Sequence, residues 1–280
     1  MARMDEYTRL VVEEFERAVR EHEAYTVPWL NLDVAAYQAY REGRSQVLPT
    51  PYCHDPANRL MMENAAGLDV LLLAGGGGQQ SAVFALLGAR VTVLDLMEEQ
   101  LQSDRVAAGH YGTTVRTIQG IMSDLSVFAD GSFDRVYQPI STLYAPDLRP
   151  VYAEVRRVLR PSGLYYSDYA FPLLYMAQNQ GWDGKGFALR ITEPYQRGNI
   201  RETEDGRVTF SEGKPIGETH HLFSDILNGM IGAGLAIRGL WENPRPDVPL
   251  EQQMLPYDKP EQQARCLPFG ISVVAQKMAL

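Results

Sequence analysis

The stretch between Leu68 and Asp95, LDVLLLAGGGGQQSAVFALLGARVTVLD, constrains the fold of this 280-residue chain most strongly. An apolar run leads into four glycines at 75–78, apolar residues at helical spacing follow, and a second apolar run ends on Asp95. This order predicts a strand, a glycine turn, a helix and a second strand. Such a βαβ unit opens a doubly wound sheet, so we expect an α/β fold.

The glycine turn and Asp95 together predict a site for a nucleoside cofactor. Glycine lacks a Cβ atom, so the backbone can turn sharply and approach a ligand closely. A carboxylate at the tip of the second strand can accept hydrogen bonds from ribose hydroxyls. The dinucleotide pattern G-x-G-x-x-G would place its third glycine at Ser81. The motif therefore leaves open an NAD site, another nucleoside site, or a turn that binds no ligand.

Composition and charge exclude several classes of function. The chain is 45% hydrophobic and 22% charged, as soluble globular proteins are, and its net charge of −9 argues against phosphate-driven nucleic-acid binding. No apolar segment is long enough for a membrane span, and the N-terminus lacks an apolar signal core. Cys53 and Cys266 lie far apart and indicate neither a metal cluster nor a disulfide framework. We therefore expect a cytoplasmic protein without a bound metal.

Residues 1–58 predict a helical lid. Residues 4–24 carry apolar positions at helical spacing, and residues 33–42 indicate a second short helix. This extension could lie over the cofactor with four aromatic side chains: Trp29, Tyr37, Tyr40 and Tyr52. The alternative is that these rings pack against the edge of the sheet, as buried aromatic side chains commonly do.

The later elements continue the alternation of strands and helices. Strands are expected at 115–118, 133–137, 164–167, 235–241 and 271–277, and helices at 98–111, 148–159 and 220–232. Together with the first two strands, they would complete a sheet of about seven strands. Residues 170–219 predict an inserted cap after the fifth strand, in which 188–191 and 207–210 form a hairpin joined by a turn at 200–206.

Four motifs occur in a specific order along the chain. The glycine turn is followed by the acid Asp95, by Phe-Asp-x-Val at 133–136, and by Arg-Val-Leu-x-Pro-x-Gly at 157–163. In this order they resemble the class I S-adenosylmethionine-dependent methyltransferases, well over residues 65–170 and more loosely over 215–277. The resemblance implies a Rossmann-like methyltransferase domain at 59–280, S-adenosyl-L-methionine as cofactor and S-adenosyl-L-homocysteine as product.

The resemblance also implies how the cofactor is held. The glycine turn would line the methionine and ribose, Asp95 would bind the ribose, and Leu96 would pack on the adenine. The third loop and the tip of the fourth strand would complete the site. The candidate cofactor-binding residues are Ala74, Gly75, Gly76, Gly78, Asp95, Leu96, Met122, Ser123, Asp124, Gln138 and Pro139.

Two acids that this family normally uses are absent. Leu72 stands where an acid commonly reaches the methionine amino group, and Ile121 stands where an acid pairs with the adenine amino group. A buried adenine amine without an acceptor would cost about 1–3 kcal/mol. We therefore expect Asp124 or Ser123 to replace the second acid. A backbone carbonyl or a lid residue would replace the first.

Methyl transfer from a sulfonium needs proximity and alignment more than covalent chemistry. A hydroxyl or ammonium acceptor also needs a general base, and the candidates near the expected mouth are His220, His221 and Tyr144. Their alternative roles are a helix cap, a solvated face or simple packing. A neutral amine or a carbanion would need no base.

We expect the acceptor to be a small molecule that is methylated at O, N or C. The inserted cap carries residues that could roof an apolar pocket or form a homodimer contact: Phe171, Tyr175, Met176, Trp182, Phe187 and Tyr195. Two other functions stay open at this point. One is an NAD-binding oxidoreductase, and the other is a non-catalytic nucleoside-binding module.

Overall fold

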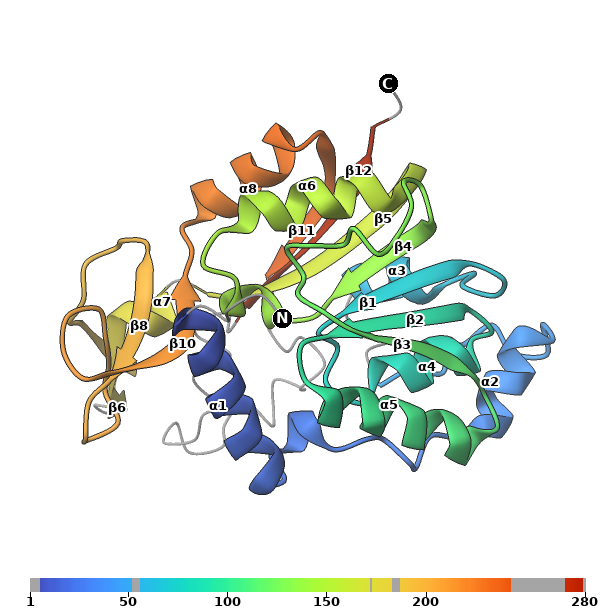
Figure 1. Cartoon of the computed structure of the whole chain (residues 1–280), viewed down its shortest axis with the longest axis horizontal. Helices are drawn as coiled ribbons and strands as arrows, with labels where there is room; N and C mark the ends of the chain where they lie inside the picture. The colour runs from blue at the N-terminus through green and yellow to red at the C-terminus, as the bar shows by residue number, and fades with distance from the viewer. Residues whose placement is uncertain (1–5, 52–55, 172, 183–186, 243–269, 279–280) are drawn as a thin grey trace.

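A seven-stranded sheet forms the centre of the molecule (Figure 1). The computed structural model describes residues 6–51, 56–171, 173–182, 187–242 and 270–278. Across the sheet the strands are β11 (Leu235–Glu242), β12 (Gly270–Lys277), β5 (Leu159–Ala170), β4 (Phe133–Gln138), β1 (Asp69–Leu73), β2 (Arg90–Asp95) and β3 (Val115–Gln119). The strands from β5 to β3 are parallel, whereas β12 runs antiparallel to both β5 and β11. The predicted α/β sheet of seven strands is confirmed.

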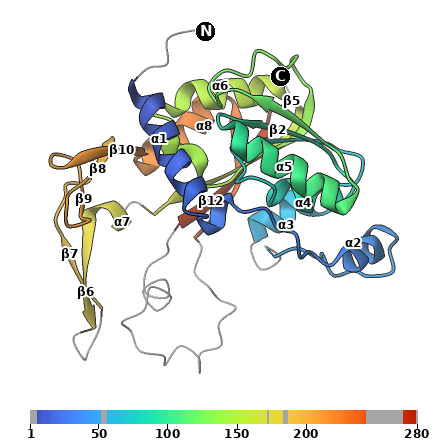
Figure 2. The same ribbon diagram turned by 60° about the horizontal axis from the view of Figure 1, so that its bottom comes forward.

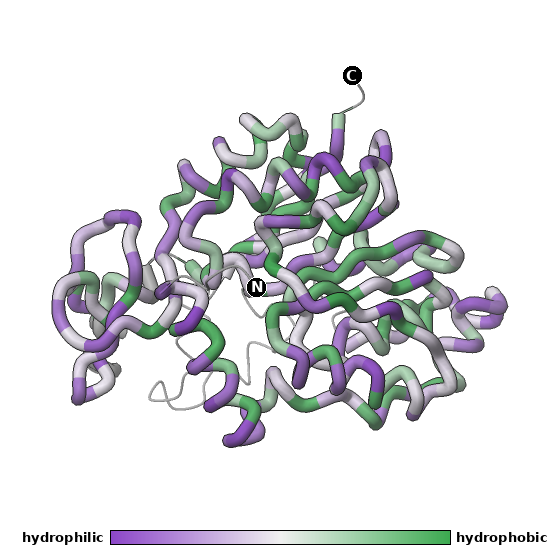
Figure 3. Tube along the Cα trace, in the orientation of Figure 1, coloured by the Kyte–Doolittle hydropathy of each residue, from purple (hydrophilic) through white to green (hydrophobic). Residues whose placement is uncertain are grey.

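Side chains of successive strand residues point to opposite faces of the sheet and build two hydrophobic cores. On β1, Leu71 and Leu73 belong to one core, and Val70 and Leu72 belong to the other. The first core is covered by α6 (Leu148–Val158) and α8 (Phe223–Gly232). The second is covered by α2 (Val34–Arg41), α3 (Pro56–Met62), α4 (Gln80–Leu86) and α5 (Glu98–Tyr111). Parallel strands covered on both faces read as continuous apolar runs, which is the pattern of residues 70–73 in β1 (Figure 3).

The N-terminal helix α1 (Glu6–Arg20) belongs to neither layer and lies beside β10 (Lys214–His220) (Figures 1 and 2). The two elements approach closely, because a Cβ atom at Gly217 would lie 2.9 Å from the backbone nitrogen of Val11. The hydroxyl of Tyr7 lies 2.8 Å from Thr219 Oγ1 and donates a hydrogen bond to the Leu143 carbonyl at 3.2 Å. These contacts fix α1 against the inserted cap.

The expected lid aromatics do not accompany α1. Tyr37 is only 2% exposed and is part of the second core, and Trp29 and Tyr40 pack against the same core. They follow the short helix η1 (Ala24–Thr26), where the chain turns from α1 toward α4. Apolar burial on the sheet side thus decided their position: of the two alternatives, packing against the sheet is the one that holds for these three residues. Tyr52 lies outside the described residues, as do Cys53 and Cys266.

The inserted cap consists of a hairpin and a second small sheet. After α7 (Leu173–Met176), β6 (Ala177–Trp182) pairs with β7 (Phe187–Ile191), whereas β8 (Gly198–Glu202) lies between β9 (Val208–Thr209) and β10. The expected pairing of 188–191 with 207–210 is therefore wrong, and residues 200–206 are not simply a turn. Ile200 is the one fully buried apolar side chain of β8, too little for a periodic signal. The side chains of Trp182 and Phe187 lie outside the described part.

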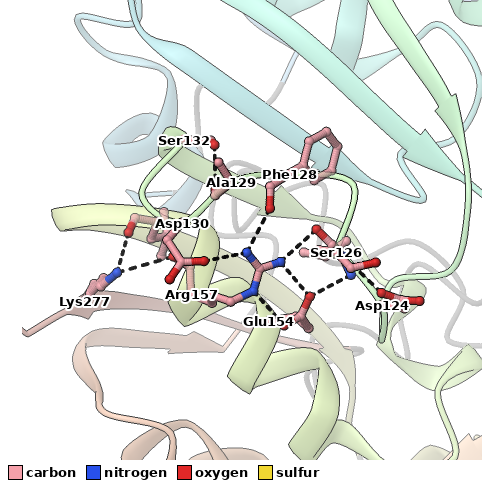
Figure 4. Close-up of polar contacts among 11 residues, drawn as sticks. Asp124, Ser126, Phe128, Ala129, Asp130, Ser132, Glu154, Arg157 and Lys277 are labelled. Carbon is pink, nitrogen blue, oxygen red and sulfur yellow. Dashed lines mark hydrogen bonds and ion pairs between the residues drawn. The ribbon is translucent and has the colours of Figure 1, made fainter.

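Arg157 of α6 anchors the loop between β3 and β4 (Figure 4). Its guanidinium donates hydrogen bonds to the carbonyls of Leu125 and Phe128, both at 2.8 Å, and pairs with Asp130 and Glu154, also at 2.8 Å. Glu154 in turn accepts a hydrogen bond from the Leu125 N–H at 2.8 Å. One planar side chain thus satisfies several groups of a loop that has no regular structure.

We expect Arg157→Met to lower the free energy of unfolding by about 1–3 kcal/mol, because the loop carbonyls lose a charged donor. Arg157→Lys is the matched control: it keeps the charge but cannot reach several acceptors at once, and should lose less. Urea denaturation measures both. Equal stability of the wild type and Arg157→Met would show that the loop does not depend on this anchor.

Candidate active site

A cavity of about 250 Å³ opens at the carboxyl ends of β1, β2 and β3. One wall is built from the loops that follow these strands, and the other from α1 and the segment after η2 (Ser141–Tyr144). Ligands of doubly wound sheets bind at this edge. Of the predicted cofactor residues, the cavity wall contains Ala74, Gly76, Asp95, Leu96, Met122 and Ser123.

The glycine turn needs its glycines for two different reasons. Gly76, Gly77 and Gly78 have φ values of 61°, 45° and 85°, in the region that side chains disfavour. Gly76 lines the cavity, as predicted. Gly78 faces the other way, because its Cβ atom would lie 2.6 Å from the Ser103 carbonyl of α5. Gly78 therefore allows helix packing instead of lining a ligand, and Gly75 is likewise buried outside the cavity wall.

Asp104 of α5 holds the glycine turn in place. Its side chain is 1% exposed, and Oδ1 accepts hydrogen bonds from the Gly78 N–H at 2.7 Å and from the Ser81 hydroxyl. Burial raises the pKa of Asp104 to about 6, although these two hydrogen bonds oppose the shift. The motif analysis did not single out Asp104. The sequence signal for Asp104 was an acid on the inner face of a predicted helix, among apolar residues.

Asp95 stands at the tip of β2, as predicted, and borders the cavity. It is 6% exposed and accepts a hydrogen bond from the Met97 N–H at 2.8 Å. Burial raises the pKa of Asp95 to about 7, and the nearby charge of Asp104 adds to this effect. A carboxylate held in this way gains from any ligand that donates hydrogen bonds to it.

Gln100 is a candidate that the motif analysis missed. It lies on α5, is 2% exposed and lines the cavity, yet neither its amide nitrogen nor its amide oxygen has a hydrogen-bond partner in the described part of the chain. A buried amide without partners is costly, so this side chain fits a ligand that carries hydroxyl groups. Its position, five residues after Asp95 on the next helix, was the available signal.

The third loop, which follows β3, contributes two of its three predicted residues to the cavity wall. Met122 and Ser123 line the cavity, together with Ile121, but Asp124 does not. The Asp124 side chain is exposed and accepts a hydrogen bond from the Ser126 N–H at 3.0 Å, and this contact lowers its pKa. Figure 4 shows Asp124 beside Ser126, in the loop that Arg157 anchors. Of the two expected replacements for the missing acid, only Ser123 is in place.

Gln138 and Pro139 lie behind the cavity wall instead of in it. Gln138 is fully buried: its Oε1 accepts a hydrogen bond from the Tyr165 hydroxyl at 2.6 Å, and its Nε2 lies 3.1 Å from the Met122 sulfur. The buried tyrosine thus holds the amide away from the site. Gln138 can position Met122, but the assignment of Gln138 and Pro139 as direct cofactor contacts is not supported by this geometry.

Only one of the three candidate bases borders the cavity. Tyr144 lines it and packs edge-on against Phe15 of α1, with ring centroids 4.9 Å apart. Burial raises the pKa of Tyr144 above its ordinary value, which disfavours the tyrosinate that a general base would require.

The two histidines lie elsewhere. His220 ends β10 and His221 follows it, so neither opens α8 as expected. His220 is 2% exposed and its ring lies 5.5–6.0 Å from Tyr175, Phe210 and Tyr195. Burial lowers the pKa of both histidines, and neither borders the cavity. Packing of the cap decided their position.

Two classes of site are not found in the described part of the molecule. Its side chains bring no three His, Cys, Asp or Glu residues together as a metal site would require. Its helices also include none with the length and apolar character needed to cross a bilayer.

Comparison with known proteins places this cavity in context. Residues 71–167 match a family described as a methyltransferase domain. The uncharacterized methyltransferase YbaJ of Bacillus subtilis is 34% identical over 177 residues, which cover 63% of this chain and 69% of that protein. A sterol 24-C-methyltransferase of Gibberella zeae is 36% identical over 102 residues, which cover 35% of this chain and 27% of the enzyme. A solved S-adenosylmethionine-dependent methyltransferase of Mesorhizobium loti has the same fold, with a TM-score of 0.63 and 23% identity over 79% of this chain and 96% of that one.

The sheet order and the cavity at its carboxyl edge define a Rossmann-like methyltransferase domain. The chain belongs to the class I S-adenosylmethionine-dependent methyltransferases. This confirms the resemblance drawn from the four sequence motifs.

Affinity for S-adenosylhomocysteine should depend on pH through Asp95. Its pKa is raised to about 7 in the free protein, and ribose hydroxyls would favour the charged form. Affinity should therefore be full above that pH and fall as the pH drops through it, by at most about tenfold per pH unit. Calorimetry between about pH 8.5 and pH 5.5 measures this slope. Asp95→Asn should bind S-adenosylhomocysteine weakly, and its affinity should depend less on pH. If the affinity of the wild type does not change with pH, the assignment of Asp95 to the ribose is contradicted.

Asp104→Ala should loosen the glycine turn, because it leaves the Gly78 N–H and the Ser81 hydroxyl without their acceptor. We expect a loss of about 1–3 kcal/mol in unfolding free energy and weaker binding of S-adenosylhomocysteine. Asp104→Asn is the control that keeps an oxygen acceptor and removes the buried charge. It should retain most of the stability and shift the Asp95 midpoint to lower pH. Identical behaviour of both variants would show that the hydrogen bonds to the turn do not matter.

Proposed function

We propose that this methyltransferase binds S-adenosylmethionine in the cavity and transfers its methyl group to a small organic acceptor held against α1. The observation that carries the proposal is the division of the cavity into two unlike walls. The strand-loop wall has the acid, the buried amide and the glycine turn that a nucleoside needs. The opposite wall, from α1, the end of η2 and the segment after it, has mostly aromatic and apolar side chains, besides Thr8 and Asp147, and such side chains suit an organic acceptor.

The residues of the strand-loop wall fit an adenosine. Asp95 would accept hydrogen bonds from the ribose hydroxyls. Gln100 would both donate hydrogen bonds to them and accept hydrogen bonds from them, which would give its buried amide the partners that it lacks. Leu96 and Met122 would enclose the adenine, and Ser123 would take over the acceptor role that an acid usually fills at Ile121. When bound, the cofactor would supply an electrophilic methyl group, and these side chains would bind and orient it.

The methionine end must be held differently from the usual family pattern. Leu72 is fully buried in the second core, so β1 sends no carboxylate toward the cavity. Gly76 borders the cavity at this end, and its exposed backbone can accept or donate hydrogen bonds. Helix α1, the first helix of the predicted lid, contributes Tyr7 and Thr8 to the opposite wall. We propose that the backbone of the turn and the lid together hold the methionine.

A small acceptor is favoured over a macromolecule because α1 closes one side of the cavity. Tyr7, Val11 and Phe15 of this helix border it, and contacts with β10 fix the helix there. Some relatives are named for sterol methylation, but their matches cover 35% to 55% of this chain and at most 33% of those proteins. Their substrate therefore does not transfer by similarity.

Calorimetry tests the cofactor assignment. S-adenosylhomocysteine should bind the wild type, and NAD should not. Asp95→Ala and Gln100→Leu should each weaken binding by about tenfold or more, because a hydrogen bond to a charged group contributes about 1.5–3 kcal/mol and a buried amide somewhat less. Asp124→Asn is the matched control, an acid on the same edge that faces away from the cavity, and should stay within about twofold. Binding of NAD alone would support an oxidoreductase, and binding of neither ligand would support a non-catalytic module.

A further inference from the structure

We propose that a second cavity, next to the first, binds the anionic group of a small organic ligand, a carboxylate or a phosphate. This cavity has a volume of about 370 Å³, which is ample for a small organic molecule. It shares Pro146 and Asp147 with the first cavity, so its occupant would lie beside the wall opposite the cofactor. The inference goes beyond the proposed function, because it concerns a separate site.

Two helices bring their N-termini to the second cavity. Arg149 in the first turn of α6 lines it, as do Ser224 and Asp225 in the first turn of α8. The helices lie side by side (Figure 1), and a Cβ atom at Gly229 of α8 would lie 2.7 Å from Tyr152 Cε2 of α6. The N-terminus of a helix carries partial positive charge and free N–H groups, so both helix ends favour a negatively charged group.

Two arginines line this cavity from different parts of the molecule. Arg149 comes from the central fold, whereas Arg197 comes from the cap, immediately before β8. Arg149 Nη2 lies 2.6 Å from Asp147 Oδ2, and Arg197 Nε donates a hydrogen bond to Asp225 Oδ2 at 2.8 Å. Both ion pairs use Nε and Nη2, and neither Nη1 group has a hydrogen-bond partner among the described residues. A guanidinium has five N–H donors, so each arginine can keep its acid and still bind an anion.

The two acids of the cavity are already satisfied. Asp147 Oδ1 accepts a hydrogen bond from the backbone N–H of Arg149 at 2.9 Å, in addition to its ion pair. Asp225 Oδ2 accepts one from the backbone N–H of Leu222 at 3.1 Å, in addition to its own ion pair. Each carboxylate is therefore held by an arginine and by the start of its helix. The unused hydrogen-bonding capacity of the two ion pairs lies on the donor side, which favours an anion over a cation.

His221 is a buried polar side chain of the same cavity. It is 7% exposed, and its Nε2 has no hydrogen-bond partner in the described part of the molecule. A buried ring nitrogen without a partner is costly, so a ligand that supplies one is favoured. When protonated, an imidazole donates from both nitrogens, and a neighbouring anion stabilises that form. The Ser224 hydroxyl and the Asn228 amide add neutral donors to the cavity wall.

The rest of the lining suits the organic part of the ligand. Pro146, Leu148 and Gly229 contribute no charge, and Leu148 is buried. Carboxylates and phosphates match the planar donor set of an arginine and can bridge two of them. The ligand class that fits is therefore a small organic acid or a phosphate ester.

Calorimetry on the full-length protein tests the site with defined probes. Benzoate and phenyl phosphate are the anionic probes, benzyl alcohol and benzylamine are their neutral and cationic counterparts, and inorganic phosphate lacks the organic part. At about pH 7.5, where a carboxylate is ionised, at least one organic anion should bind about tenfold or more tightly than either counterpart. Added salt should weaken this binding. The ratio of benzoate to phenyl phosphate affinity shows which anionic group the site prefers.

Arg149→Gln and Arg197→Gln should each weaken binding of the preferred anion by about tenfold, because each removes a charged donor group. Arg207→Gln is the matched control. Arg207 forms an exposed ion pair of the same cap, with Asp205 at 2.9 Å, and lines neither cavity. Its variant should bind within about twofold of the wild type. Melting temperatures of all three variants separate a loss of binding from unfolding.

The histidine rings locate the bound anion. In nuclear magnetic resonance spectra of protein with labelled histidines, saturation with the preferred anion should shift the ring signals of His221. The signals of His22 and His110, which line neither cavity, should stay in place.

Three results would overturn the site. The first is that neither organic anion binds better than benzyl alcohol. The second is that Arg207→Gln weakens binding as much as the two variants in the cavity. The third is that the His221 signals do not move on saturation. The proposed function is tested separately by titration with S-adenosylhomocysteine, so either conclusion can fail without the other.

Discussion

The architecture of this methyltransferase depends on one buried contact, between the glycine turn after β1 and helix α5. Gly78 comes so close to the Ser103 carbonyl that a side chain could not fit, and Asp104 fixes the turn by accepting its N–H. The same helix begins just after Asp95 and carries Gln100. Rigid packing of α5 against the turn therefore sets the spacing between Gly76, Asp95 and Gln100 at the cavity.

The two walls of the cavity have different structural origins. The strand-loop wall is part of the central fold, and its third loop is anchored by Arg157 of α6, which does not line the cavity. The opposite wall is added by α1 and the segment after η2, with β10 of the cap behind it. A common fold can in this way keep one cofactor site while peripheral elements change the acceptor.

Much of the fold could be predicted from local patterns. The apolar runs of β1 and β2 differ clearly from the helical spacing between them, and their connection through a glycine turn leaves few topologies. The cap was harder, because β8 has a single buried apolar residue, Ile200, and its pairing with β10 is nonlocal. From the sequence, Trp29 and Tyr37 could have covered either a cofactor or the sheet. They pack where they bury more apolar surface, against the second core. A local sequence pattern does not show which of two surfaces is the larger.

The sequence by itself determined the order of the strands and helices, the glycine turn, the acid at the tip of β2 and the class of enzyme, since each of these depends on residues that are neighbours along the chain. Only the tertiary structure decided which polar groups meet. It turned Asp124 toward solvent, buried Gln138 behind Met122, enclosed His220 in the cap, and brought Gln100 to the cavity. The physical reason is that a side chain's direction follows from packing among distant elements, and a buried polar group goes where its hydrogen bonds can be made.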